Sequence, residues 1–198
     1  MGAPEGGPAR PGHRPDPAPA PLSPGVYLLR NVASGLVLEV PGGSKGSGAK
    51  VRQGPAAAGA AAQQWQLAPV HSGGGLYHLV NVHSGKRLDV TGASTENGAT
   101  VQQWKANNYG AQEWIVERLL GDPTRNDVVV LVSWVSGLLL EVADGSLAEG
   151  AGIRQWEDTD SPSQWWRLEP VTPAPGAGPD PGAGQRPGGG QRPGGGSG

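Results

Sequence analysis

The sequence predicts an all-β domain in which three similar units close into one barrel between two disordered tails. Three observations carry this prediction. The stretch 84–114 is repeated in similar form at 34–65 and at 136–166, with shifts of 50 and 52 residues. Short runs rich in Val, Leu and Trp alternate with Ser-Gly, Asn-Gly and Gly-Gly turns, and no helical periodicity lasts three turns. Proline and glycine gather at the two ends of the chain.

The proline distribution sets the domain boundaries. Residues 1–24 hold eight of the 20 prolines and residues 172–198 hold six, which leaves six for the 147 residues between them. Such segments have too few apolar side chains to offset the entropy of ordering, so both tails are predicted to be disordered. The QRPGGG hexapeptide, written twice within 185–196, leaves open a partner contact. The body spans 25–171, with repeats at 25–70, 75–119 and 127–171.

Each repeat contains four predicted strands, so the body has twelve. In the second repeat they are 76–81, 87–91, 100–105 and 113–117. The dipeptide 84–85, Ser-Gly, forms the turn of the first hairpin and recurs at 34–35 and 136–137. A unit of about 50 residues cannot bury its own hydrophobic face, so the three units are expected to share one core. A closed barrel with pseudo-threefold symmetry and a cap of hairpins also removes exposed sheet edges.

Composition excludes several classes of function. A net charge of −2 and the absence of cysteine give no reason to expect nucleic acid, disulfides or a thiolate metal site. We expect a monomer that needs no metal and no cofactor. We also expect no membrane insertion, since no apolar run approaches the ~18 residues of a membrane span. The N-terminus lacks the apolar segment of a signal peptide, which makes the cytoplasm the default location. The bias toward Gly, Ala, Pro and Arg suggests a GC-rich bacterial gene.

Catalysis is excluded on geometry and on motifs. The repeated acids Glu39, Asp89 and Glu141 are related by the pseudo-threefold, which places them on the order of 20–30 Å apart in a body of this size. Glycosidase carboxylates lie within roughly 5–9.5 Å of one another. The four histidines form neither an H-E-x-x-H motif nor a triad, and no G-x-S-x-G is present. We therefore predict a protein without catalytic residues.

A candidate binding site follows from strand alternation in the second repeat. Leu88 faces the core, so Asp89 is expected to point the other way, and Val101 in the core turns Gln102 and Trp104 outward. The three polar or aromatic side chains then converge on the solvent side of adjacent strands. A carboxylate accepts from hydroxyls, an amide both donates and accepts, and an indole covers the apolar face of a pyranose. This combination favours carbohydrate binding.

Three copies of SG-x-x-L-[D/E]-V, G-A-x-[V/I]-x-Q and Q-x-W make the body resemble the ricin B-type lectin family, a β-trefoil. The resemblance covers the globular body and neither tail. It implies non-catalytic carbohydrate binding in shallow pockets, up to one per repeat, and family members are commonly secreted. It also implies contacts from polar residues after the aromatic, here Asn107 and Asn108, while Tyr109 adds a wall. The sugar is expected to be galactose-, xylose- or glucan-like.

The Gln-x-Trp boxes are interpreted as structural. Trp114 is in phase with Val116, which predicts an inward position, and its glutamine is expected to bond loop backbone. The same holds for the other boxes, which are Gln63/Trp65 and Gln164/Trp166. A second set of glutamines recurs at positions usually apolar in the family, and these are interpreted as tolerated, half-buried amides: Gln53, Gln103 and Gln155.

The other two repeats are poorer copies of the candidate site. The first has Glu39, Arg52 and Gly54 at the equivalent positions, followed by an alanine-rich loop, so its pocket is predicted to be inactive. The third keeps an aromatic and is a possible weaker second site, formed by Glu141, Arg154 and Trp156. Either its acid and arginine form an ion pair across adjacent strands, which we favour, or the arginine binds an acidic sugar.

Two alternatives remain open. An acid recurs at the position of Asp89 in all three repeats, which also fits a structural role. In that role the Asp89 side chain would cap the loop 92–98 by bonding the backbone of the loop. The whole domain also fits a protein-interaction trefoil in which the sugar pockets have decayed.

Overall fold

The computed structural model describes residues 22–71, 75–119 and 127–171. The predicted tails, 1–24 and 172–198, lie outside the described residues except for 22–24. Leu22 packs against the core, and its carbonyl accepts a hydrogen bond from the Tyr77 hydroxyl. Leu22 therefore packs with the described body, although it precedes the predicted boundary at residue 25.

Six strands close into a barrel, in which each strand is antiparallel to the next. In order around the ring they are β1 (Gly25–Asn31), β4 (Trp65–Pro69), β5 (Leu76–Asn81), β8 (Trp114–Arg118), β9 (Val128–Ser133) and β12 (Trp166–Pro170). β12 pairs with β1, so the ring has no free edge.

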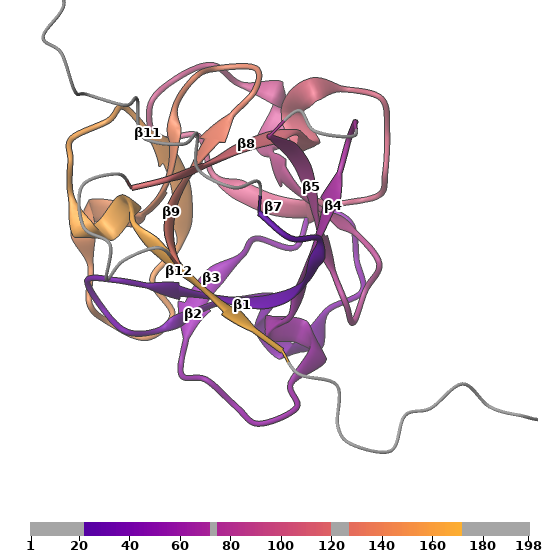
Figure 1. Cartoon of the computed structure of the whole chain (residues 1–198), viewed down its shortest axis with the longest axis vertical. Helices are drawn as coiled ribbons and strands as arrows, with labels where there is room; N and C mark the ends of the chain where they lie inside the picture. Colours follow the sequence, from indigo (N-terminus) through magenta and orange to yellow (C-terminus); the bar gives the residue numbers. More distant parts are fainter. Residues whose placement is uncertain (1–21, 72–74, 120–126, 172–198) are drawn as a thin grey trace, which may run out of the picture.

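Three hairpins cap one end of this barrel. They are β2 (Val37–Glu39) with β3 (Arg52–Gly54), β6 (Arg87–Val90) with β7 (Val101–Trp104), and β10 (Leu139–Val142) with β11 (Ile153–Trp156). Single bridges join each hairpin to the next: Lys50 to Gln102, Arg52 to Gly152 and Thr100 to Arg154. Figure 1 shows the result as three lobes, indigo to purple, pink and orange, around a common centre.

Short 3-10 turns close the loops of every repeat. One follows the second strand of each repeat, namely η1 (Pro41–Gly43), η3 (Thr91–Ala93) and η6 (Ala143–Gly145). Another precedes the fourth strand, namely η2 (Ala61–Gln63), η4 (Gly110–Gln112) and η7 (Pro162–Gln164). The predicted twelve-strand β-trefoil is confirmed, and in the second repeat each predicted strand lies within one residue of its observed bounds.

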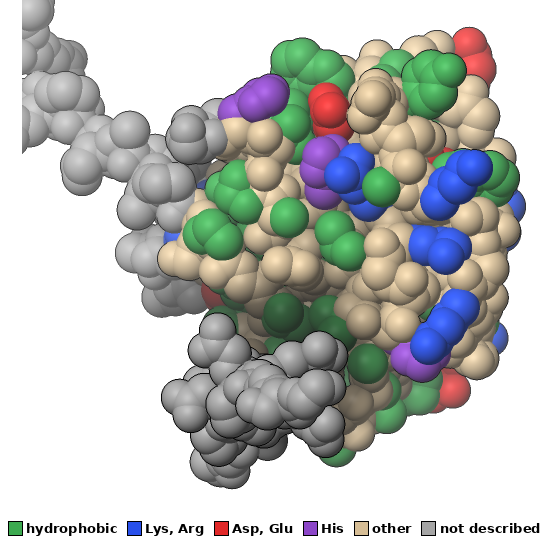
Figure 2. Space-filling model, turned by 90° about the vertical axis from the view of Figure 1, so that its right-hand side faces the viewer, with side chains coloured by type: hydrophobic (Ala, Val, Ile, Leu, Met, Phe, Trp, Pro, Cys, Tyr) green, Lys and Arg blue, Asp and Glu red, His purple; other side chains and the backbone are tan. Residues whose placement is uncertain are grey.

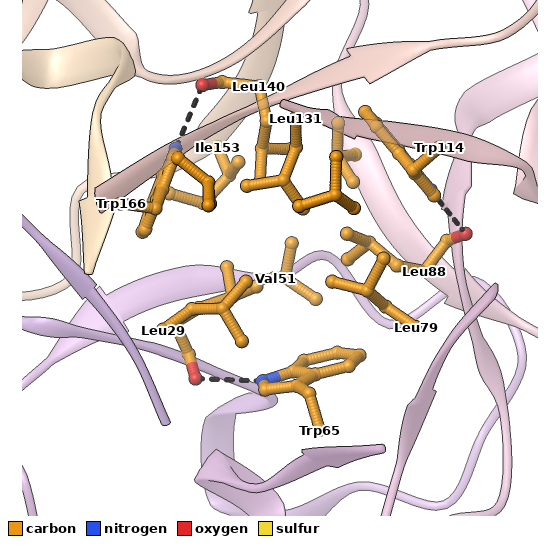
Figure 3. Close-up of a cluster of buried hydrophobic side chains, with 14 of the residues drawn as sticks. Leu29, Val51, Trp65, Leu79, Leu88, Trp114, Leu131, Leu140, Ile153 and Trp166 are labelled. Carbon is orange, nitrogen blue, oxygen red and sulfur yellow. Dashed lines mark hydrogen bonds between the residues drawn. The ribbon is translucent and has the colours of Figure 1, made fainter. Parts of the chain in front are cut away.

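The three box tryptophans are buried around the centre of the core. Trp65, Trp114 and Trp166 are at most 1% exposed. Each indole N–H donates to the carbonyl of a leucine on the second strand of its own repeat, such as Leu88 for Trp114 at 3.2 Å. Figure 3 shows these side chains around a shared cluster of aliphatic residues. Their inward direction agrees with the alternation along the strands.

A second set of glutamines links the repeats, and here the sequence interpretation was wrong. Gln103 is fully buried, not half-buried. Its amide oxygen accepts from the Ser84 hydroxyl of its own repeat, and its amide nitrogen donates to the carbonyls of Ser44 and Gly46 in the first repeat. The equivalent glutamines link the other repeats in the same way. The Gln53 amide donates to the carbonyls of residues 146 and 148 in the third repeat, and the Gln155 amide donates to those of residues 94 and 96 in the second.

The surface is mixed in charge. On the face in Figure 2, Lys and Arg side chains are spread over one side and separated by neutral surface. Among the residues that the structure describes, no helix has the length and apolar character to cross a membrane.

Replacing Trp114 with alanine is expected to lower the free energy of unfolding by about 3–5 kcal/mol, because it removes a fully buried aromatic side chain and its hydrogen bond. Urea unfolding measures this change. A midpoint equal to that of the wild type would show that the tryptophan is not part of the core.

Replacing Gln103 with leucine is expected to loosen the neighbouring repeat. The change removes two hydrogen bonds, from the Gln103 amide to the carbonyls of Ser44 and Gly46, each worth about 0.5–1.5 kcal/mol. Hydrogen exchange should then speed up at 44–48, far from the substitution in sequence. Gln66→Leu, at an exposed position of β4, is the control. Faster exchange confined to β6 and β7 would contradict the link.

Candidate functional site

A pocket of about 470 Å³ opens in the second repeat. It lies between the loop that contains η3 and the loop that contains η4, above the hairpin β6–β7. Five of the six residues proposed from the sequence line it, together with small residues from both loops. The lining residues are Asp89, Thr91, Gly92, Ala93, Gln102, Trp104, Asn107, Tyr109 and Ala111.

Asp89 is the acid of this pocket, and two neutral amides hold it. One carboxylate oxygen accepts from Nε2 of Gln102 at 2.8 Å, and the other accepts from Nε2 of Gln112 at 3.1 Å. An ionised carboxylate has about four acceptor positions, so these two bonds leave acceptor capacity for a ligand. No positive side chain contacts this carboxylate among the described residues.

The predicted solvent-facing positions of Asp89 and Gln102 need correction. Their exposed fractions are only 5% and 6%, because η3 and the loop 105–112 fold over the strands that carry them. Both side chains leave the core as alternation predicts, yet they form the buried inner part of a pocket. The alternative role of Asp89 as a cap of the loop 92–98 is also wrong, since its hydrogen bonds go to two glutamine side chains.

The first repeat contributes Lys50 to this region, which the sequence analysis missed. Its ammonium group donates to Oε1 of Gln102 at 3.2 Å and to the Thr91 hydroxyl. This fixes the orientation of the Gln102 amide, which must accept from Lys50 on one side and donate to Asp89 on the other. Lys50 reaches Gln102 because a single β-bridge pairs these two residues of different repeats. A motif defined within one repeat gives no indication of this pairing.

Trp104 is the aromatic wall, and it is half-buried. One edge of its indole packs against the first repeat, where a Cβ added to Gly48 would lie 3.3 Å from Cζ3 of the ring. Gly48 has a φ of +87°, a conformation that glycine adopts without strain. The second repeat thus supplies the ring, and a glycine of the first repeat allows its close approach.

The loop 105–112 is held by the box glutamine. Oε1 of Gln112 accepts from the backbone N–H of Asn107, and Nε2 donates to the Lys105 carbonyl as well as to Asp89. The loop-bonding role predicted for the glutamine is thus confirmed, and its bond to the acid is additional. Oδ1 of Asn107 accepts from the Tyr109 N–H, which leaves its two amide N–H groups and one acceptor position for a ligand.

The outermost predicted residues behave differently from one another. Tyr109 is 72% exposed and lines the pocket. Asn108 is exposed but does not line it, so the structure does not bring this residue together with the rest.

Arg87 supports the loop from below and affects a neighbouring histidine. Its guanidinium donates to the Asn107 carbonyl at 3.1 Å. Burial and then the charge of Arg87 lower the pKa of His78 from its ordinary value of 6.5. Because the folded-state pKa is below the unfolded value, the stability from a neutral His78 is complete above pH 6.5 and is lost as the pH falls further.

In the first repeat the acid is paired with a cation. Glu39 accepts from Nε of Arg52 at 2.8 Å and from the box glutamine, Gln63, at 2.9 Å. A Cβ added to Gly54 would lie 2.5 Å from the Glu39 carboxylate, so the acid covers the place where an aromatic would stand. The first repeat therefore has a paired acid and no room for an aromatic at this position, and the inactivity of its pocket stays a prediction.

In the third repeat the favoured ion pair is present. Arg154 donates to Glu141 at 2.9 Å and to Asp144 at 2.8 Å. Its guanidinium also lies 4.0 Å from the centre of the Trp156 ring. The arginine therefore covers one face of the aromatic and occupies the acid, which leaves little for a ligand.

The profile of the ricin-type β-trefoil lectin domain-like family matches three overlapping segments, 20–104, 61–156 and 110–176. The chain belongs to this family. The resemblance stated from the motifs is thereby confirmed. A search of curated proteins found no match.

Solved structures share the fold. The designed threefold symmetric protein ThreeFoil is 36% identical, with a TM-score of 0.68 over 74% of this chain and 99% of its own. The exo-β-1,3-galactanase 1,3Gal43A of Clostridium thermocellum is 35% identical, with a TM-score of 0.67 over 74% of this chain and 30% of the enzyme. A Macrolepiota procera ricin B-like lectin in complex with lactose is 20% identical, with a TM-score of 0.62 over 76% of this chain and 99% of its own.

Replacing Asp89 with asparagine is expected to weaken the pocket itself. The new amide can accept from only one of its two glutamine partners, and a hydrogen bond to a charged group is worth about 1.5–3 kcal/mol. Urea unfolding and amide exchange at 105–112 measure the loss. Glu39→Gln, the matched change in the first repeat, should affect the loop 55–63 instead. Unchanged exchange at 105–112 would contradict this role of the acid.

Proposed function

We propose that this protein binds carbohydrate without catalysis, chiefly through the pocket of the second repeat. One observation carries the proposal. The acid of the first and third repeats is paired with an arginine, whereas Asp89 is held by neutral amides and keeps acceptor positions for a ligand. The residue beside each acid makes this difference, since Gln102 stands where the other repeats have Arg52 and Arg154.

The pocket offers the groups that a sugar requires. The Asp89 carboxylate accepts charge-assisted hydrogen bonds from hydroxyl groups, and the N–H groups of Asn107 donate to them. Trp104 and Tyr109 present aromatic surface to the apolar C–H face of a pyranose. A pocket of about 470 Å³ that is open to solvent is of a size to take one or two sugar units.

The first ligands to test are galactose-containing glycans. The support is the galactanase of Clostridium thermocellum, whose name states its substrate and part of which is 35% identical to this chain. Xylose- and glucan-type ligands follow, because the pocket chemistry fits any pyranose with neighbouring hydroxyls. If no glycan of these classes binds, the protein-interaction trefoil becomes the better account.

Binding of a monosaccharide is expected to be weak and to occur at one site per chain. A dissociation constant of about 0.1–1 mM corresponds to about −5 to −4 kcal/mol, and the loss of an aromatic wall is comparable with that total. Trp104→Ala should therefore abolish detectable binding in an NMR titration. Trp156→Ala, the matched change in the third repeat, should leave binding intact. Loss of binding in the Trp156 variant alone would move the site to the third repeat.

A further inference from the structure

An exposed aromatic of the third repeat lies against the loop that forms one wall of the second-repeat pocket. Trp134 and Val135 form the turn between β9 and β10, and their exposed fractions are 57% and 40%. The backbone N–H of Trp134 donates to the Glu113 carbonyl at 3.0 Å. This turn is therefore fixed against the segment that closes the pocket loop.

Gly110 shows how closely the two segments approach. A Cβ added to this glycine would lie 3.0 Å from Cδ1 of Trp134 and 3.0 Å from Cγ2 of Val135. The next residue toward the N-terminus is Tyr109, which lines the pocket and is 72% exposed. Adjacent Cα atoms are about 3.8 Å apart, so the indole of Trp134 packs one residue away from the outer wall of the pocket.

The third repeat alone has this feature. The turn positions equivalent to Trp134 hold Val32 in the first repeat and Val82 in the second, and each donates its N–H to the preceding unit in the same way. The aromatic substitution therefore occurs beside the one pocket, among the described repeats, whose acid is not paired with an arginine. Two departures from threefold symmetry, the exposed tryptophan and the acid without an arginine partner, therefore occur close to each other.

We propose that Trp134, together with Tyr109, forms a second binding position for the next sugar unit of an oligosaccharide whose terminal unit occupies the second-repeat pocket. This inference rests on the proposed function. The preferred ligand is then a chain of at least two or three sugar units. The pocket fixes one end of this chain, and the aromatic pair holds the part that leaves the pocket.

The chemistry of the patch fits a glycan better than a protein surface. Trp134 and Tyr109 are both exposed to solvent, so each combines an apolar face with a polar group that a sugar hydroxyl can reach. A stable protein interface buries about 800 Å² on each partner. The patch consists of Tyr109, Trp134 and Val135, and an aromatic side chain buries at most about 250 Å², so the patch is too small for a stable protein interface.

The test compares a monosaccharide with its tetrasaccharide by isothermal titration. The pairs are galactose with β-1,3-galactotetraose, xylose with xylotetraose and glucose with cellotetraose. The wild-type chain should bind the tetrasaccharide of its sugar about tenfold more tightly than the monosaccharide. Trp134→Ala should remove this gain and leave the affinity for the monosaccharide unchanged. Trp134→Phe should retain part of the gain, and Val82→Ala, at the equivalent turn, should retain all of it.

The other outcomes separate the inference from the proposed function. If no monosaccharide or tetrasaccharide binds to the wild-type chain, the proposed function fails and the inference fails with it. If the monosaccharide binds but the tetrasaccharide binds no better, or if Trp134→Ala keeps the gain, only the inference is overturned. It is also overturned if Trp134→Ala weakens the monosaccharide, because the tryptophan then acts by holding the pocket loop. A wild-type dimer in sedimentation equilibrium that Trp134→Ala disrupts would assign the patch to self-association.

Discussion

The structure depends on one interaction repeated in a circle, the buried glutamine that ties each repeat to the one before it. Gln103 shows its form, with an oxygen bonded to a serine of its own repeat and a nitrogen bonded to two carbonyls of the first repeat. Burial of an amide is unfavourable unless its groups are satisfied, so the neighbouring loop is required for this side chain to be stable. No repeat is complete alone, which is why the three units fold as one closed body.

The same circular link makes the candidate pocket a product of two repeats. The loop that Gln103 holds continues into Gly48 and Lys50, which contact Trp104 and Gln102 respectively. The orientation of the Gln102 amide, and through it the position of the acid, therefore depends on a lysine one repeat earlier in the sequence. Similarly, Gly110, which stands between the lining residues Tyr109 and Ala111, lies against Trp134 from the repeat that follows.

Much of the fold could be predicted because its signals are local. The strand pattern and the inward tryptophans follow from alternation, and the pairing of Glu141 with Arg154 follows from adjacent strands. The depth of Asp89 could not be predicted, since alternation gives a direction but not the loops that later cover it. The roles of Lys50 and Gln103 were also missed, because their partners lie in another repeat and a motif defined within one repeat contains no information about them.

The three acids also show how a symmetric fold can keep one site open. A buried carboxylate is costly unless it is paired or fully hydrogen-bonded, and the first and third repeats satisfy theirs with an arginine. The second repeat has a shorter acid, Asp89, and a neutral Gln102, so its carboxylate keeps acceptor positions that face the pocket. The ammonium group of Lys50 donates to the Gln102 amide oxygen and not to the Asp89 carboxylate. Under the proposed function, the hydroxyl groups of a sugar would supply the hydrogen bonds that an arginine supplies to the other two acids.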